Sequence, residues 1–194
     1  MHLSKDSFDA IAFEDVKKDE RTYSVKFAEP LTIQTKRSTV ATGCDGFSSP
    51  LVRVDLDAET AQVLRDFEAF IKEETKKHKA EWFKKTISDA YLESSFKTYF
   101  KGDDTATAAF KVAEDFALFD ASGNALADAE GNDFIFLLEA TQLTFGKTEY
   151  GCLWKVRQAV VLPAPKKREC LIQVTDDDEA AAPGTVDDDE DYFL

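Results

Sequence analysis

The sequence contains little of what marks secreted, membrane or disulfide-rich proteins. No apolar run approaches the roughly 20 residues that a membrane-spanning helix needs, and residues 1–15 show no apolar segment behind a basic start, as a secretory signal would. The three cysteines, Cys44, Cys152 and Cys170, are odd in number and far apart, which favours free thiols over a disulfide framework. We therefore expect a soluble protein of an intracellular, reducing compartment.

Histidine is also scarce, with only His2 and His78 in 194 residues, and no His or Cys pair has metal-ligand spacing. Residues 146–148 (GKT) resemble the end of a phosphate-binding loop, but Thr141 stands where that loop requires glycine. Residues 128–139 have the acid spacing of a calcium loop, but Asp133 stands where its glycine belongs. We expect no enzymatic activity, metal or cofactor, although the many carboxylates leave a two-carboxylate enzyme as an alternative.

The negative charge is unevenly distributed along the chain. Residues 176–194 contain nine Asp and Glu and no Lys or Arg, so they account for −9 of the net −14 and leave −5 for the rest. The sequence pI of about 4.6 therefore reflects the C-terminal segment more than the remainder of the chain. The acidic pI does not exclude nucleic acid as a partner.

Alternating apolar and polar residues predict a mainly β protein. In residues 51–56, for example, Val52, Val54 and Leu56 share one face, opposite Arg53 and Asp55. The aromatic content, with sixteen Phe, is sufficient for a core. The other expected strands are residues 22–27, 31–35 (after an interruption at Pro30), 111–119, 134–145 and 153–162.

One long amphipathic helix interrupts the predicted strands. Asp57 suits the N-cap position, and Leu64, Phe67 and Ile71 are among the apolar residues that follow at intervals of three and four. The helix is expected to run to about Lys79, with the helical insertion spanning residues 57–85. Many short strands with one inserted helix predict a β-barrel of the OB-fold kind. The expected organisation is an N-terminal arm (1–20), the barrel domain (21–165) and a linker with a disordered acidic tail (166–194).

Basic and aromatic residues on the expected strands are the candidate binding site. Single-stranded nucleic acid needs cations for its phosphates and flat side chains on which its bases stack. Trp154 shares a face with Val156 and Val160, so a place in the core is the main alternative for its ring. The candidate nucleic-acid contacts are Lys26, Lys36, Arg37, Arg53, Tyr99, Lys101, Lys147, Tyr150, Trp154, Lys155 and Arg157.

The chain resembles the single-stranded DNA-binding proteins of phages and large DNA viruses that combine an OB-fold with an acidic C-terminal tail. The likeness lies in residues 30–36 (PLTIQTK), in the helix from 67 to 83 that ends in EWF, and in residues 150–159 (YGCLWKVRQA). The family often has proline where this chain has Lys36. The resemblance implies sequence-tolerant binding of single strands in replication, recombination or repair, at a viral replication site, in the cytoplasm or in the nucleus. It points to Lys36, Arg37, Lys155 and Arg157 as phosphate contacts.

The last nineteen residues predict a disordered tail, because a run of acids without apolar residues cannot offset the entropy of ordering. An acidic stem with an aromatic tip resembles tails that recruit polymerases and helicases, and the same charge is expected to compete with DNA for the protein's cations. Two alternatives remain: a protein-interaction module, and an acidic DNA mimic or chaperone. A homodimer is also left open. The predicted partner-binding residues are Asp187, Asp188, Asp189, Glu190, Asp191, Tyr192, Phe193 and Leu194.

Overall fold

A computed structural model describes residues 1–18, 22–40, 51–83, 85–100, 107–128 and 133–163. The predicted tail, including its aromatic tip, lies outside these residues, as do Lys101, Cys44 and Cys170. The helices and strands are 3-10 helix η1 (Lys5–Ala10), β1 (Lys17–Lys18), β2 (Tyr23–Gln34), β3 (Ser38–Val40), β4 (Leu51–Asp55), α1 (Ala58–Lys77), α2 (Lys79–Trp82), α3 (Asp89–Ser95), β5 (Thr107–Phe119), β6 (Ala125–Leu126), β7 (Asp133–Phe145) and β8 (Tyr150–Val161).

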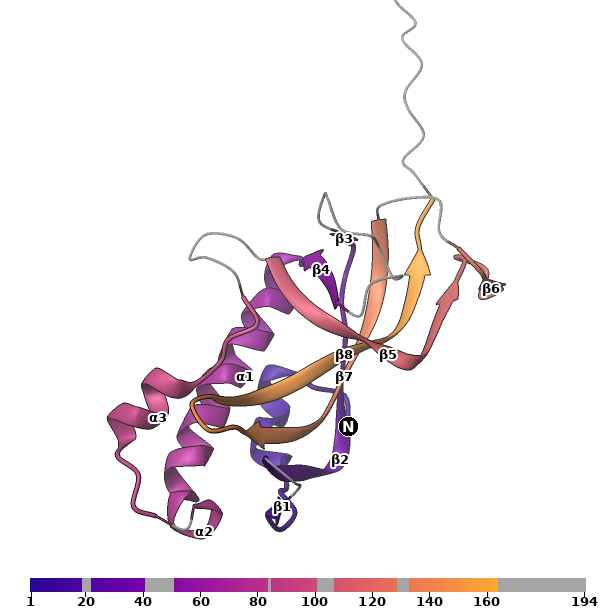
Figure 1. Ribbon diagram of the computed structural model, residues 1–194. Helices are drawn as coiled ribbons and strands as arrows, with labels where there is room; N and C mark the ends of the chain where they lie inside the picture. The colour runs from indigo at the N-terminus through magenta and orange to yellow at the C-terminus, as the bar shows by residue number, and fades with distance from the viewer. Residues whose placement is uncertain (19–21, 41–50, 84, 101–106, 129–132, 164–194) are drawn as a thin grey trace, which may run out of the picture. The chain divides into compact units, whose positions relative to one another are not determined.

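Five strands close into a barrel (Figure 1). β3 pairs with β4, β4 with β5, β5 with β8, β8 with β7, and β7 with β3 again. Only the β5–β8 pairing in this ring is parallel. If the five barrel strands are numbered in chain order, their spatial order around the ring is first, second, third, fifth, fourth. This is the strand order of an OB barrel. The predicted fold class, a mainly β barrel with one inserted long helix, is confirmed for the described residues.

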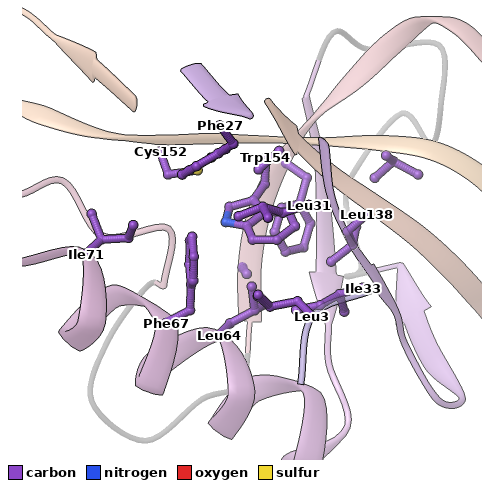
Figure 2. Close-up of a cluster of buried hydrophobic side chains, with 14 of the residues drawn as sticks. Leu3, Phe27, Leu31, Ile33, Leu64, Phe67, Ile71, Leu138, Cys152 and Trp154 are labelled. Atoms are coloured by element: carbon purple, nitrogen blue, oxygen red, sulfur yellow. The ribbon is translucent and has the colours of Figure 1, made fainter. Parts of the chain in front are cut away.

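The core is built from the inward faces of these strands and from one side of α1. Val52 and Val54 are fully buried, as their alternation predicted. Figure 2 shows Leu64 and Phe67 projecting from α1 toward the Trp154 ring. The centroids of the Phe67 and Trp154 rings lie 5.5 Å apart in an edge-to-face arrangement. The long helix therefore supplies the barrel with part of its apolar interior.

The N-terminal segment belongs to this packing. Leu3, Phe8 and Ile11 are buried in the same core, and the Leu3 amide donates to the Thr32 carbonyl at 2.6 Å. The amino group of residue 1 donates to the carbonyl of Pro30 at 2.6 Å. Residues expected to form an arm are thus anchored along β2.

Pro30 does not interrupt the strand, and that prediction is wrong. β2 runs from Tyr23 to Gln34, and its register against β7 shifts between Lys26 and Leu31. Pro30 lies within this irregular stretch, where it takes no part in the regular pairing. A β-bulge accommodates proline because the missing N–H costs no ladder hydrogen bond there.

Asp57 caps α1 as predicted. Its carboxylate accepts from the Thr60 amide at 2.9 Å, from the Thr60 hydroxyl at 2.5 Å and from the Lys36 amide at 3.0 Å. Burial disfavours the charged carboxylate, but these hydrogen bonds outweigh it and lower the pKa of Asp57. One side chain therefore both starts the helix and fixes the connection between β2 and β3.

Replacing the cap should measurably destabilise the protein. Asp57→Ala is expected to lower the free energy of unfolding by about 2 kcal/mol, the upper end for an N-cap, because the Lys36 amide also loses its acceptor. Urea unfolding followed by circular dichroism measures the loss. Asp57→Asn is the matched control, since its amide oxygen still accepts from Thr60 and should retain most of the stability. Equal losses in both variants would show that the charge, rather than the cap, stabilises the helix.

Candidate nucleic-acid interface

Three cations lie together on the outer surface of β4, β5 and β8. Lys111 of β5 is paired with Leu51 of β4 on one side and with Lys155 of β8 on the other. Arg53 follows Leu51 by two residues, so it points from the same side of β4. None of the three cations forms an ion pair with another residue of the described ranges. We call Arg53, Lys111 and Lys155 the cationic face.

Burial of the intervening residues fixes the direction of these side chains. Val52 and Phe110 are buried between β4 and β5, and Trp154 and Val156 are buried on either side of Lys155. Successive side chains of a strand point to opposite faces, so the four apolar residues fill the barrel while the cations point outward. Adjacent strands lie about 4.8 Å apart, which brings Lys111 and Lys155 close enough to contact neighbouring phosphates.

Lys111 was missed by the sequence analysis, whereas Arg53 and Lys155 were included. The sequence pattern places Lys111 only at the start of the predicted strand 111–119, whereas β5 begins at Thr107. Buried Phe110 before it marks Lys111 as outward-facing. Its proximity to Lys155 depends on a parallel pairing between strands more than 40 residues apart, and no local pattern contains that information.

Arg157, a predicted phosphate contact, already has two carboxylate partners. It contacts Asp115 at 2.7 Å and Glu139 at 3.0 Å. Val156 of β8 is paired with Leu138 of β7, and Gln158 is paired with Leu137. Arg157 is therefore an extra residue of β8 without a partner in β7, which is a β-bulge. The arrangement suits Arg157 to holding β5, β7 and β8 together at an irregular point of the barrel.

The bulge also changes which residues of β8 face inward. The alternation that puts Trp154 on one face with Val156 and Val160 also puts Gln158 there. Trp154 and Val156 are buried, but Gln158 is exposed and Ala159 is buried instead. An extra residue in one strand moves every following side chain to the other face, so the prediction is wrong beyond Val156.

Lys36 and Arg37 lie between β2 and β3, each next to one acid. Lys36 pairs with Glu59 of α1, and Arg37 pairs with Asp133 at 2.5 Å. The hydrogen bond and charge of Glu59 raise the pKa of Lys36. Exposed pairs of this kind contribute little stability, so a phosphate could exchange with either carboxylate. Both remain candidate contacts outside the cationic face.

The remaining predicted cations lie apart from the cationic face. Lys26 is exposed on β2, and Lys147 is exposed in the turn between β7 and β8. Neither has an ion-pair partner among the described residues. Lys101 lies outside the described residues. The structure therefore brings together Arg53 and Lys155 from the predicted set, and adds Lys111.

Two of the three predicted aromatic contacts are buried in the core. Trp154 is 1% exposed and Tyr150 is 5% exposed. Tyr99 is half-buried, with its hydroxyl out of contact with solvent. A base stacks only on a ring face that it can reach, so the prediction that Trp154 contacts nucleic acid is wrong for this structure. Tyr150 is also largely buried, but its ring lines a pocket at the β7–β8 turn, so its role as a contact stays a prediction.

Glu68 is a buried carboxylate that positions the segment before β5. It accepts from the Thr98 hydroxyl at 2.9 Å and from the Tyr99 amide at 3.1 Å. Burial raises the pKa of Glu68, and it raises those of the Tyr99 hydroxyl and the Cys152 thiol beside it. A buried thiol with a raised pKa is protonated at neutral pH and unreactive. We therefore assign Glu68, Tyr99 and Cys152 a structural role, in which the hydrogen bonds of Glu68 fix the segment before β5.

In the part of the chain that the structure describes, no three His, Cys, Asp or Glu side chains are grouped to hold a metal ion. No described helix is long and apolar enough to cross a membrane.

Comparisons with known proteins give one family and a set of distant structures. The model of a family described as "Family of unknown function (DUF5871)" matches residues 47–170, and no curated protein matches the chain. Among solved structures, the single-stranded DNA-binding protein from bacteriophage Enc34 aligns over 87% of this chain and 99% of its own, with 10% identity and a TM-score of 0.43. The same phage protein in complex with single-stranded DNA aligns over 79% and 97%, with 11% identity and a TM-score of 0.40. Likeness this distant does not assign a function to the chain.

Proposed function

This chain belongs to the DUF5871 family of unknown function, and we propose that it binds single-stranded DNA along the outer surface of β4, β5 and β8. The cationic face is the observation that carries the proposal, because three cations without carboxylate partners among the described residues lie on adjacent strands. Oligonucleotide-binding OB barrels use the face of their second and third strands and the loops after the first and fourth. Here those strands are β4 and β5, and the fourth strand is followed by the turn at residues 146–149.

The composition of this surface favours sequence-tolerant binding. Lysine and arginine neutralise phosphates, which carry no base information. Leu51, 51% exposed beside Lys111, offers an apolar contact for a sugar or base. The local concentration of cations is the more telling because the chain as a whole is acidic.

The sequence of the C-terminal segment supports a second part of the proposal. Its nine acids suit electrostatic competition with DNA for the cationic face, and its Tyr-Phe-Leu end suits an apolar pocket of a polymerase or helicase. The proposed role is to coat exposed strands during replication, recombination or repair while the tail recruits replication proteins.

Titration of fluorescent oligo-dT tests this function. The full-length chain is expected to bind, and a chain cut after Thr175 is expected to bind more tightly because the competing −9 charge is gone. Affinity should fall as salt rises, because phosphate binding releases counterions. Absence of binding by both forms at low salt would overturn the proposal. Equal affinities of the full-length and the cut chain would overturn only the proposal that the tail competes with DNA.

A further inference from the structure

An aromatic pocket of about 330 Å³ lies between the α2–α3 region and the turn that joins β7 to β8. Figure 1 shows α2 and α3 near the β7–β8 end of the barrel. The pocket is partly open to solvent, and its size is at the small end of ligand-binding cavities. We define the aromatic pocket by its six rings: Tyr23, Trp82, Phe83, Tyr91, Phe145 and Tyr150.

Three rings of the pocket, Trp82, Phe145 and Tyr150, are buried, whereas Tyr91 is exposed. Phe145 and Tyr150 stack with centroids 5.6 Å apart, and Phe83 meets Phe145 edge to face at 5.1 Å. Trp82 and Phe145 lie 5.8 Å apart. Tyr91 is 46% exposed, and its hydroxyl donates to the Lys147 carbonyl at 3.4 Å. Flat apolar walls with an accessible tyrosine suit a planar ring better than a bulky aliphatic group.

The charges around the pocket are positive on balance. Lys85 and Lys147 line it and are exposed, and neither forms an ion pair within the described residues. Glu149, the acid among the lining residues, is engaged by Lys97 at 2.8 Å. A ligand that joins a flat ring to a nearby negative group would match both features.

We propose that the aromatic pocket receives one unstacked base of the bound single strand, with Lys147 and Lys85 contacting the flanking phosphates. This inference rests on the proposed function and names a second contact region for the same ligand. The turn at residues 146–149 follows the fourth barrel strand, one of the two loops that OB barrels use for oligonucleotides. β8 runs through both regions, and Tyr150 lies about 17 Å along it from Lys155. The two side chains point to opposite faces of β8, so a bound oligonucleotide that contacts both regions has to pass around the β7–β8 turn.

Replacing Tyr91 tests the pocket with little risk to the fold, because the residue is 46% exposed and lies outside the buried core. Tyr91→Ala in the full chain is expected to weaken oligo-dT binding about 5- to 100-fold, the loss that removal of one stacking contact produces. Tyr91→Phe is the matched control: it keeps the ring, loses only the hydroxyl contact with the Lys147 carbonyl, and should bind like the wild type. Thermal melting of each variant checks folding. An abasic oligonucleotide of the same length should bind Tyr91→Ala and wild type equally.

Trp82 supplies a second readout. The chain has two tryptophans, so Trp154→Phe leaves only the one in the pocket, and its emission should change when oligo-dT binds but not when the abasic strand binds. Wild-type affinity of Tyr91→Ala for oligo-dT, or an equal loss for both oligonucleotides, would overturn base insertion while leaving strand binding intact. Failure of the wild-type chain to bind oligo-dT would instead overturn the proposed function itself.

Discussion

Reversing the charge of Lys111 and Lys155 together should weaken oligo-dT binding about 100-fold or more. Each lysine is expected to make one charge-assisted hydrogen bond to a phosphate, worth roughly 1.5 kcal/mol or more, and two such losses amount to about two decades of affinity. Because both side chains point away from the barrel, Lys111→Glu/Lys155→Glu should unfold near the wild-type temperature. The dependence of log affinity on log salt should become shallower by about 1.4, since each phosphate contact with a single strand contributes about 0.7 to the slope.

A control of equal charge separates this effect from general repulsion. Lys17→Glu/Lys18→Glu makes the same change in net charge on β1, which pairs with β2 and is not one of the five strands of the barrel ring. Both of these lysines are exposed. The control should lose only a few-fold in affinity at low salt and almost nothing near physiological salt, where screening is strong. Equal losses in the two double variants would refute a localised binding face.

The parts of the fold that could be predicted are those specified by short-range patterns. The Asp57 cap and the apolar spacing of α1 are local, and the structure places the helix start within a residue of the prediction. The inward direction of Val52 and Val54 follows from simple alternation. In both cases the residues that decide the structure are sequence neighbours.

The parts that were missed depend on tertiary contacts or are too short for a periodic pattern. Helix α3 has seven residues, and only Leu92 and Ser95 of it are buried, so it contains no helical repeat. The strand pair β1–β2 involves two residues of β1. The bulge at Arg157 is visible only in the register between β7 and β8. Its effect, Ala159 rather than Gln158 in the core, could not be deduced from β8 alone.

The candidate site shows the same division. Sequence reasoning identified cations on strands, and it included Arg53 and Lys155 correctly as outward-facing residues. Which cations have carboxylate neighbours cannot be deduced from the sequence, because the partners are far apart along the chain. Arg157 contacts Asp115 and Glu139. Arg37 contacts Asp133. Composition therefore indicates the kind of ligand, while strand pairing determines which side chains are available to it.

Trp154→Ala should be the most destabilising single substitution on β8, at a cost of about 3–5 kcal/mol in the free energy of unfolding. The ring is 1% exposed and meets Phe67 of α1 edge to face, so its removal leaves a cavity between the barrel and the long helix. Urea unfolding measures the cost. Trp154→Phe should lose much less, because an aromatic ring remains and the indole N–H has no hydrogen-bond partner among the described residues.

The same two variants distinguish a core tryptophan from a base-stacking one. If Trp154 only packs, Trp154→Phe should bind oligo-dT with wild-type affinity, and so should the folded fraction of Trp154→Ala at low temperature. If Trp154 stacks on a base, Trp154→Phe should keep part of the affinity and Trp154→Ala should lose about 5- to 100-fold, even where both are folded. That second result would require the barrel to open on binding, because the Trp154 ring is enclosed by α1 and the strands around it.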